Sequence, residues 1–193
     1  MSNLRLIVQP IVLAVGLAFA VRATLLGIYA IPSPSMQPTL QVGDRIVVTR
    51  YFSDQPARRG DVVVFRSPLG GDEVMVKRVV GIPGDLIETR AGRVIVSGHT
   101  LPEPYLPSGA ITGGVAPQVV PADCYFVLGD NRVNSLDSRD WGVLPRRLFV
   151  GRARIVLWSS ATSSSEPRAN ATAVAQPHPA HPIGTDRLFK AID

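Results

Sequence analysis

A short serine- and proline-rich segment, residues 31–40, offers a hydroxyl that could act as a nucleophile. The segment reads Ile-Pro-Ser-Pro-Ser-Met-Gln-Pro-Thr-Leu. Each proline fixes its own φ and disfavours helical backbone in the residue before it, so Ser33 and Gln37 are predicted to be extended. We therefore expect a stiff, extended segment that presents Ser35 beside Met36. Its composition is also typical of a linker between a membrane segment and a folded domain.

A serine nucleophile requires a base to accept its proton, and histidine is a poor candidate in this chain. Of the three histidines, His178 and His181 lie in a low-complexity stretch. His99 lies in a predicted turn after a strand, within Ser97-Gly98-His99-Thr100. The Gly-x-Ser-x-Gly and Ser-x-x-Lys motifs of other serine hydrolases are absent. A Ser-His-Asp triad is therefore disfavoured.

A lysine is the alternative base. The chain has only two lysines against eighteen arginines, and Lys77 lies within the apolar run 74–80. With the period of two of a strand, Lys77 shares a face with Met75 and Val79. Burial on such a face would lower the pKa of the ammonium group and leave a neutral amine. A solvent-exposed lysine on an edge strand fits the same pattern.

A polar segment, Gly129 to Gly142, supplies a third set of functional side chains. It follows an apolar run and is dense in residues that hydrogen-bond to backbone. In a long loop of this kind Ser135 could orient the lysine, and Asp137 with Arg139 could form an ion pair that braces the loop. An ordinary turn rich in Asp and Asn is the simpler alternative.

An apolar N-terminal run indicates how the chain meets a membrane. Residues 6–21 are almost wholly apolar, and Arg22 can snorkel to the interface, so we predict a transmembrane anchor over 6–26 after a cytoplasmic segment 1–5. A cleaved signal peptide ending at Ala18-Phe19-Ala20 is the competing interpretation. Both interpretations send the bulk of the chain across the membrane.

From residue 27 to 158 the pattern is that of short strands separated by turns, which predicts a mainly β domain with an antiparallel sheet. Residues 159–193 are rich in Ser, Ala and Pro, and we expect a disordered tail, with a short helical turn over 186–192. The strands are predicted at 45–49, 61–65, 74–80, 93–96, 125–128 and 152–158.

Charge and cysteine content narrow the choice of partners. The net charge is +5, but the basic residues are scattered, which favours attraction to anionic lipid over nucleic-acid binding. Cys124 is the only cysteine, so the chain can form no intramolecular disulfide, and we expect a small buried side chain there. There is no Cys/His cluster with the spacing of a metal site, and no metal or cofactor is predicted.

These segments, taken together and in order, resemble bacterial type I signal peptidase, the Ser/Lys-dyad peptidases of the S26 family. The resemblance covers about residues 22–158. It rests on Ile31-Pro-Ser-Pro-Ser-Met-Gln-Pro-Thr-Leu40, Gly43-Asp44-Arg45, Arg59-Gly-Asp-Val-Val-Val-Phe65, Lys77-Arg-Val-Val-Gly-Ile-Pro-Gly-Asp85, Gly129-Asp-Asn-Arg-Val-Asn-Ser-Leu-Asp-Ser-Arg139 and Gly151-Arg152-Ala153.

The resemblance assigns roles to residues of this chain. It implies Ser35 as nucleophile, Lys77 as general base, Ser33 with the Ser35 backbone N–H as oxyanion hole, Ser135 as the residue that orients the lysine, Asp137 and Arg139 as a supporting ion pair, and Met36 near the substrate. Two positions depart from the family pattern. Val133 stands where the family often has aspartate, and Pro34 where it often has glycine.

The resemblance also implies an activity. A single-pass protein of the inner (plasma) membrane, with its catalytic domain on the extracytoplasmic side and in contact with the lipid bilayer, would cleave exported preproteins at Ala-x-Ala sites. Two alternatives stay open. One is a processing peptidase with a narrow substrate. The other is a non-catalytic β-domain that binds extended peptides by strand addition.

Overall fold

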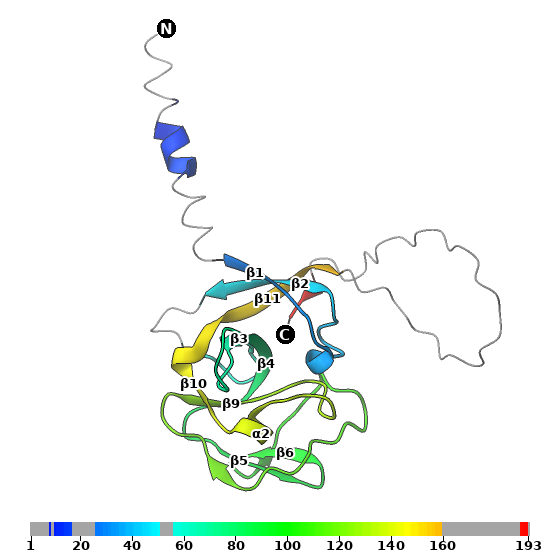
Figure 1. Cartoon of the computed structure of the whole chain (residues 1–193). Helices are drawn as coiled ribbons and strands as arrows, with labels where there is room; N and C mark the ends of the chain where they lie inside the picture. The colour runs from blue at the N-terminus through cyan, green and yellow to red at the C-terminus, as the bar shows by residue number, and fades with distance from the viewer. Residues whose placement is uncertain (1–7, 9, 17–25, 51–55, 160–189, 193) are drawn as a thin grey trace, which may run out of the picture.

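The computed structural model shows a protein built from antiparallel strands, with very little helix (Figure 1). It describes residues 8, 10–16, 26–50, 56–159 and 190–192. The elements are β1 (Leu26–Ala30), η1 (Pro34–Met36), β2 (Asp44–Arg50), β3 (Val62–Arg66), β4 (Val74–Gly81), β5 (Leu86–Arg90), β6 (Arg93–Val96), β7 (His99–Thr100), β8 (Gln118–Val119), β9 (Cys124–Leu128), α2 (Ser138–Trp141), β10 (Leu144–Pro145), η2 (Arg146–Leu148), β11 (Phe149–Ser159) and β12 (Lys190–Ala191).

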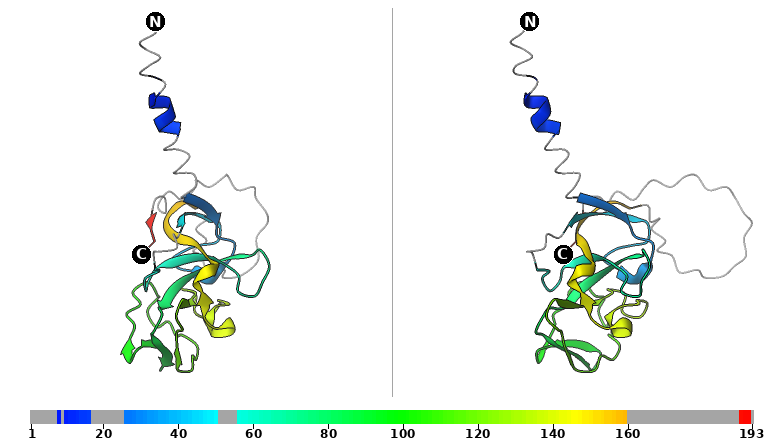
Figure 2. Two further views of the ribbon diagram at one scale, coloured as in Figure 1. Left: turned by 90° about the vertical axis from the view of Figure 1, so that its left-hand side faces the viewer. Right: turned by 60° about the vertical axis from the view of Figure 1, so that its left-hand side comes forward.

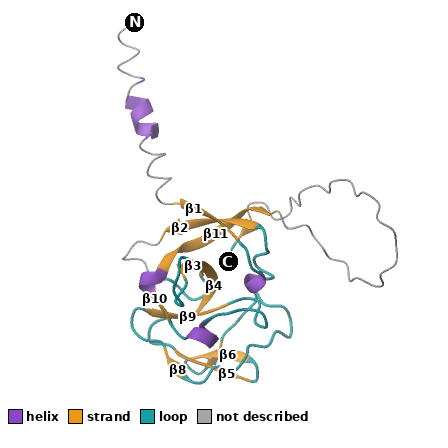
Figure 3. Ribbon diagram, in the orientation of Figure 1, coloured by secondary structure: helices purple, strands orange, loops and turns teal. Residues whose placement is uncertain are grey.

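The larger sheet carries Lys77, which lies on β4. Its strands run in the order β1-β2-β11-β3-β4-β9-β10, and β12 pairs with β11. The long strand β11 joins the two halves of the sheet, since it pairs with both β2 and β3 (Figure 3). β4 pairs with β3 along residues 74–78, but with β9 only along 78–81. Among the described strands, the first half of β4 therefore pairs with β3 alone, and its other edge is unpaired.

A smaller sheet, in the order β7-β6-β5-β8, forms the opposite end of the molecule from β1 (Figure 2). It is inserted in the chain between β4 and β9. The loop of residues 101–117 belongs to this insertion, and part of it contacts the polar segment that follows β9.

Alternate side chains of a strand pack into different hydrophobic clusters of the core. In β3, Val62 and Val64 pack into one cluster with Met36 and Leu40, whereas Val63 and Phe65 pack into another. In β9, Phe126 and Leu128 face a third cluster beneath the small sheet, while Tyr125 and Val127 face the second. Because both faces of these strands are buried, their sequences read as continuous apolar runs rather than alternating ones.

Most of the N-terminal segment predicted to be an anchor, 6–26, lies outside the described residues. Residues 8 and 10–16 are helical, and β1 begins at Leu26, the last residue of the predicted anchor. Within the part of the chain that is described, no helix has the length and apolar character needed to cross a membrane.

The prediction of a mainly antiparallel β fold is confirmed, and each of the six predicted strands is present. The sequence missed β1, β5, β7, β8, β10 and β12, which are short or carry polar residues. The helical turn predicted over 186–192 is wrong at Lys190 and Ala191, which form β12. Residues 186–189 lie outside the described residues, as does most of the predicted tail.

The last described residue, Ile192, is only 6% exposed and packs into the cluster of Leu40 and Ile46. We expect Ile192→Ala to lower the free energy of unfolding by about 2 kcal/mol, because it leaves a cavity in this cluster. Chemical denaturation measures the loss. The matched control is Ile28→Ala, which removes the same atoms from a side chain that is 60% exposed and should cost much less. Equal losses in the two variants would contradict the packing of Ile192.

Candidate active site

The structure brings Ser35 and Lys77 together although 42 residues separate them in sequence. The Nζ atom of Lys77 donates a hydrogen bond of 2.7 Å to Oγ of Ser35. Both residues are buried, with 3% of Lys77 and 8% of Ser35 exposed. A hydroxyl and an amine at hydrogen-bond distance and shielded from water are the parts needed for base-activated nucleophilic attack.

The turn that carries Ser35 is held at both ends. Ser33 and Gln37 are extended, as their prolines predict, but Pro34 to Met36 form a single 3-10 turn rather than the extended segment expected. The Gln37 N–H donates to the Pro34 carbonyl, which closes the turn. The side chain of Met36 lies in the core with 1% exposed, so the residue next to Ser35 fixes the turn to the sheet.

The buried position of Lys77 on β4 explains the lowered pKa of its amine. As the period of two predicts, Met75 and Val79 of β4 pack into one core cluster, whereas Val74 and Val76 pack into another. Burial lowers the pKa of the Lys77 ammonium to about 8, and the nearby charges of Asp137 and Asp130 oppose that shift. The neutral amine is therefore present in useful amount near neutral pH.

The two remaining serines predicted for the site lie beside this pair. Ser33 Oγ is 3.1 Å from Ser35 Oγ, and either hydroxyl can donate. Ser135 Oγ is buried, with no hydrogen-bond partner of normal geometry among the described groups. A Cβ atom added at Gly129 would come within 3.0 Å of both the Ser135 side chain and the Ser35 carbonyl oxygen. Ser135 thus lies close to the turn that carries Ser35.

Asp137 and Arg139 form the predicted ion pair. Nε and Nη2 of Arg139 donate to the two carboxylate oxygens of Asp137, each at 2.8 Å. Asp137 also caps the one-turn helix α2 and accepts from the Gly129 N–H. Its burial raises the carboxyl pKa, but the hydrogen bonds from Arg139 and Gly129 outweigh burial, and the net pKa is lowered. The pair fixes the backbone that follows β9 around Gly129.

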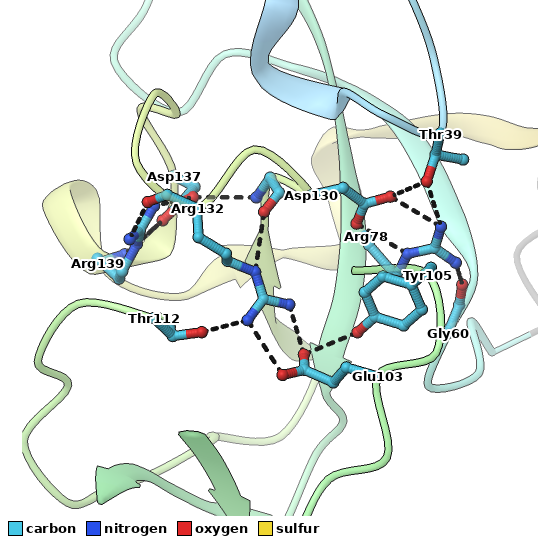
Figure 4. Close-up of polar contacts among 11 residues, drawn as sticks. Thr39, Gly60, Arg78, Glu103, Tyr105, Thr112, Asp130, Arg132, Asp137 and Arg139 are labelled. Carbon is cyan, nitrogen blue, oxygen red and sulfur yellow. Dashed lines mark hydrogen bonds and ion pairs between the residues drawn. The ribbon is translucent and has the colours of Figure 1, made fainter. Parts of the chain in front are cut away.

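A second ion pair lies next to the first and was not predicted (Figure 4). Arg78, adjacent to Lys77 in sequence, donates from Nε and Nη2 to the two oxygens of Asp130, at 3.0 and 2.9 Å. Its Nη1 atom donates to the Gly60 carbonyl at 2.9 Å. The same carboxylate accepts from the hydroxyl of Thr39, which lies a few residues after Ser35. This pair therefore joins β4, the polar segment and the segment that carries Ser35.

A third cluster joins the polar segment to the loop of the small-sheet insertion (Figure 4). The Arg132 guanidinium pairs with the Glu103 carboxylate and also donates to the Thr112 hydroxyl. The Tyr105 hydroxyl donates to Glu103 at 2.8 Å, and its ring lies 3.9 Å from the guanidinium of Arg78. Burial, with the negative charge of Glu103, raises the pKa of Tyr105 and keeps its hydroxyl protonated.

The turn that carries Ser35 is also hydrogen-bonded directly to the polar segment. The backbone N–H of Asn131 donates to the Ser35 carbonyl at 3.0 Å, and its side-chain amide donates to the Pro34 carbonyl at 3.2 Å. The arrangement suits proton transfer and acyl transfer.

Across the described ranges no three His, Cys, Asp or Glu side chains are grouped as a metal site requires.

His99 and Cys124 lie away from these contacts. His99 is exposed on β7 of the small sheet, where its Nδ1 atom interacts with the Ser97 carbonyl of the same hairpin. Cys124 is only partly buried at the start of β9, so the expectation of a fully buried thiol holds only in part.

A cleft of about 120 Å³ opens beside the Ser35–Lys77 pair. Its walls are residues 29–33, Ser35 and Met36 on one side, and Glu73 with the first half of β4, residues 74–77, on the other. The side chains are mostly apolar, and the half of β4 that lines it has one unpaired edge among the described strands. An extended peptide with short side chains could therefore lie along this edge.

Comparison with known proteins gives consistent results. Residues 4–158 match the family model described as signal peptidase, peptidase S26. A signal peptidase I of Leptolyngbya laminosa is 40% identical, over 78% of this chain and 78% of that protein. Signal peptidase I S of Bacillus subtilis is 35% identical, over 78% of this chain and 86% of that protein. A crystal structure of a signal peptidase I from Enterococcus faecalis superimposes on 52% of this chain and 98% of its own, with a TM-score of 0.45 and 32% identity.

The buried Arg78–Asp130 pair should be among the most costly contacts to break. We expect Arg78→Gln to lower the free energy of unfolding by about 3–5 kcal/mol, because it leaves the Asp130 carboxylate buried without its cation. The matched control is Arg90→Gln, since the Arg90 side chain is 67% exposed in its pair with Glu88. The control should cost less than about 1 kcal/mol. Denaturant titrations of both variants test the comparison, and similar losses would contradict it.

Proposed function

The chain belongs to the signal peptidase family, peptidase S26, and from this premise we propose that Ser35 and Lys77 form the catalytic dyad with which it removes signal peptides from preproteins. The enzyme is a serine endopeptidase. The observation that carries the residue assignment is the 2.7 Å contact between Lys77 Nζ and Ser35 Oγ in a buried setting.

The first chemical step is acylation of the enzyme. Neutral Lys77 accepts the proton of the Ser35 hydroxyl, and Oγ attacks the carbonyl carbon of the scissile peptide bond. As the C–N bond breaks, the Lys77 ammonium returns that proton to the amine of the leaving segment. Water, deprotonated by Lys77 in the same way, then hydrolyses the acyl-enzyme and regenerates Ser35.

Two donors serve the oxyanion that develops during attack. The hydroxyl of Ser33 lies 3.1 Å from Ser35 Oγ. The N–H of Ser35 belongs to the first residues of a 3-10 turn, whose N–H groups have no partner within the turn. Each such donor contributes about 3 kcal/mol to transition-state stabilisation. The buried position of the Ser135 hydroxyl, beside Gly129 and the Ser35 turn, supports its assignment as the group that orients Lys77.

The cleft next to the dyad is suited to the signal-peptide side of the substrate. With a volume of about 120 Å³ and apolar walls, it admits short side chains such as those of an Ala-x-Ala site. Met36 is buried and lines this cleft, so it limits the size of the side chain that can enter. The unpaired edge of β4 would hold the substrate backbone extended, with its carbonyl at Ser35.

The membrane setting is also a proposal. We place the chain in the inner (plasma) membrane, anchored by the segment 6–26, with the catalytic domain on the extracytoplasmic side. Ile28 of β1 and Trp158 of β11 are exposed, at 60% and 48%, on strands that both pair with β2. An apolar surface next to the proposed anchor favours contact with the bilayer, where signal-peptide cleavage sites emerge.

Incubation of the full chain with an exported precursor, followed by sequencing of the new N-terminus, tests the activity. We expect cleavage after Ala-x-Ala, and its loss in Ser35→Ala and Lys77→Met. Lys77→Arg should also be inactive, because a guanidinium stays charged. The control is Lys190→Met, which removes the exposed second lysine and should leave cleavage unchanged. Cleavage by either dyad variant would exclude the proposed mechanism.

The pH dependence of kcat/KM follows from the lowered pKa of Lys77. Its ordinary value of 10.5 falls to about 8, so the fraction of neutral amine rises with pH and levels off above that value. We expect kcat/KM to increase about tenfold per pH unit below pH 8 and to reach a plateau above it. Initial rates on one precursor between pH 6 and 9.5 measure the curve. A rate that does not vary over this range would show that Lys77 is not the base.

A further inference from the structure

A second hollow, of about 270 Å³, adjoins the turn that carries the nucleophile. It is lined by Gln37, the loop 107–111 and the segment 130–133, and it shares no residue with the cleft beside Lys77. Ser35 and Met36 line the cleft, whereas the next residue, Gln37, lines the hollow. The two concave sites therefore meet the turn at consecutive residues.

The hollow is also tied to the nucleophile by hydrogen bonds. Asn131, one of its lining residues, donates from its backbone to the Ser35 carbonyl and from its side chain to the Pro34 carbonyl. Its wall is thus fixed relative to the reacting hydroxyl. Because consecutive residues of the turn line the two sites and a strand advances about 3.3 Å per residue, we expect a peptide whose acyl group occupies the cleft to extend over this hollow within a few residues past the scissile bond.

The chemistry that the hollow offers is apolar and uncharged. Val133 is 90% exposed and Ile111 is 67% exposed, although each lies in a segment rich in polar residues or glycine. The charged residues of the lining, Asp130 and Arg132, are buried in ion pairs with Arg78 and Glu103. Their charges are therefore balanced by these partners.

From these observations we infer that this hollow binds the first residues of the preprotein's mature segment, after the scissile bond. Val133 and Ile111 select uncharged, apolar side chains at these positions. The inference depends on the proposed function, since it assigns the leaving segment of the same reaction. It makes Val133 a residue that determines specificity.

Charge-swap variants at Val133 test the inference directly. Precursors that share one signal peptide and Ala-x-Ala site carry Leu, Asp or Lys at one of the first three mature positions. We expect the unmodified full chain to cleave the Leu precursors about threefold to tenfold faster, in kcat/KM, than the charged ones at one of these positions. Val133→Asp should then prefer Lys over Asp there, and Val133→Lys the reverse, with the Lys/Asp ratio changing about tenfold between the two variants.

Val119→Asp and Val119→Lys are the matched controls. Val119 is 61% exposed on β8 and lines neither concave site, so these variants carry the same charges elsewhere on the surface. Both should retain the order Leu over Asp and Lys. High salt should weaken the preference of the Val133 variants, because exposed charges are screened.

The outcomes separate this inference from the proposed function. Normal cleavage with the same substrate order in all five proteins would overturn the inference and leave the peptidase assignment intact. Absence of cleavage of every precursor by the unmodified chain would overturn both. If Val133→Asp instead alters vesicle binding or self-association without changing substrate preference, the hollow accommodates lipid or a second copy, and the inference is wrong.

Discussion

The site depends on keeping the amine of Lys77 out of water within 2.7 Å of the Ser35 hydroxyl. A lysine in water holds its proton far too tightly to act as a base near neutral pH. Burial on β4 removes the hydration that stabilises the ammonium form, and the pKa falls to about 8. Every other feature of the site either preserves this burial or fixes the serine relative to the amine.

The two carboxylates near Lys77 would work against this burial if they were not paired. Asp137 and Asp130 both raise the pKa of the lysine. An arginine binds each carboxylate through two hydrogen bonds, Arg139 at Asp137 and Arg78 at Asp130. Most of the negative charge of each carboxylate is therefore balanced within a few ångströms. The carboxylates can therefore organise the backbone around Ser35 while the pKa of the Lys77 amine stays at about 8, well below its ordinary value. The ion pairs serve the electrostatics of the base as well as the rigidity of the loop.

Sequence reasoning found the residues whose type is unusual in its context, and missed those that act through distant contacts. Lys77 stood out because lysine is rare in this chain and lies in an apolar run, and Ser35 because prolines surround it. The period of two predicted the buried strands, but short strands such as β7 and β8 leave no pattern to detect. The pairing of Glu103 with Arg132 spans 29 residues and depends on how the small-sheet insertion folds back, which no local pattern encodes. The 3-10 turn at Ser35 was missed because proline restricts the residues before it more than those after it.

The neighbours Lys77 and Arg78 show why the two cations of β4 cannot exchange places. Both are buried, at 3% and 1% exposed, yet one position requires a group that gives up its proton and the other a group that keeps it. An ammonium responds to burial by losing its charge, whereas a guanidinium stays charged and binds a carboxylate through two parallel hydrogen bonds. A lysine at position 78 would tend to neutralise and leave Asp130 without its partner. An arginine at position 77 would place a permanent charge against Ser35 and could accept no proton from it. The order of these two residues along one strand therefore specifies both the base and the scaffold that holds it.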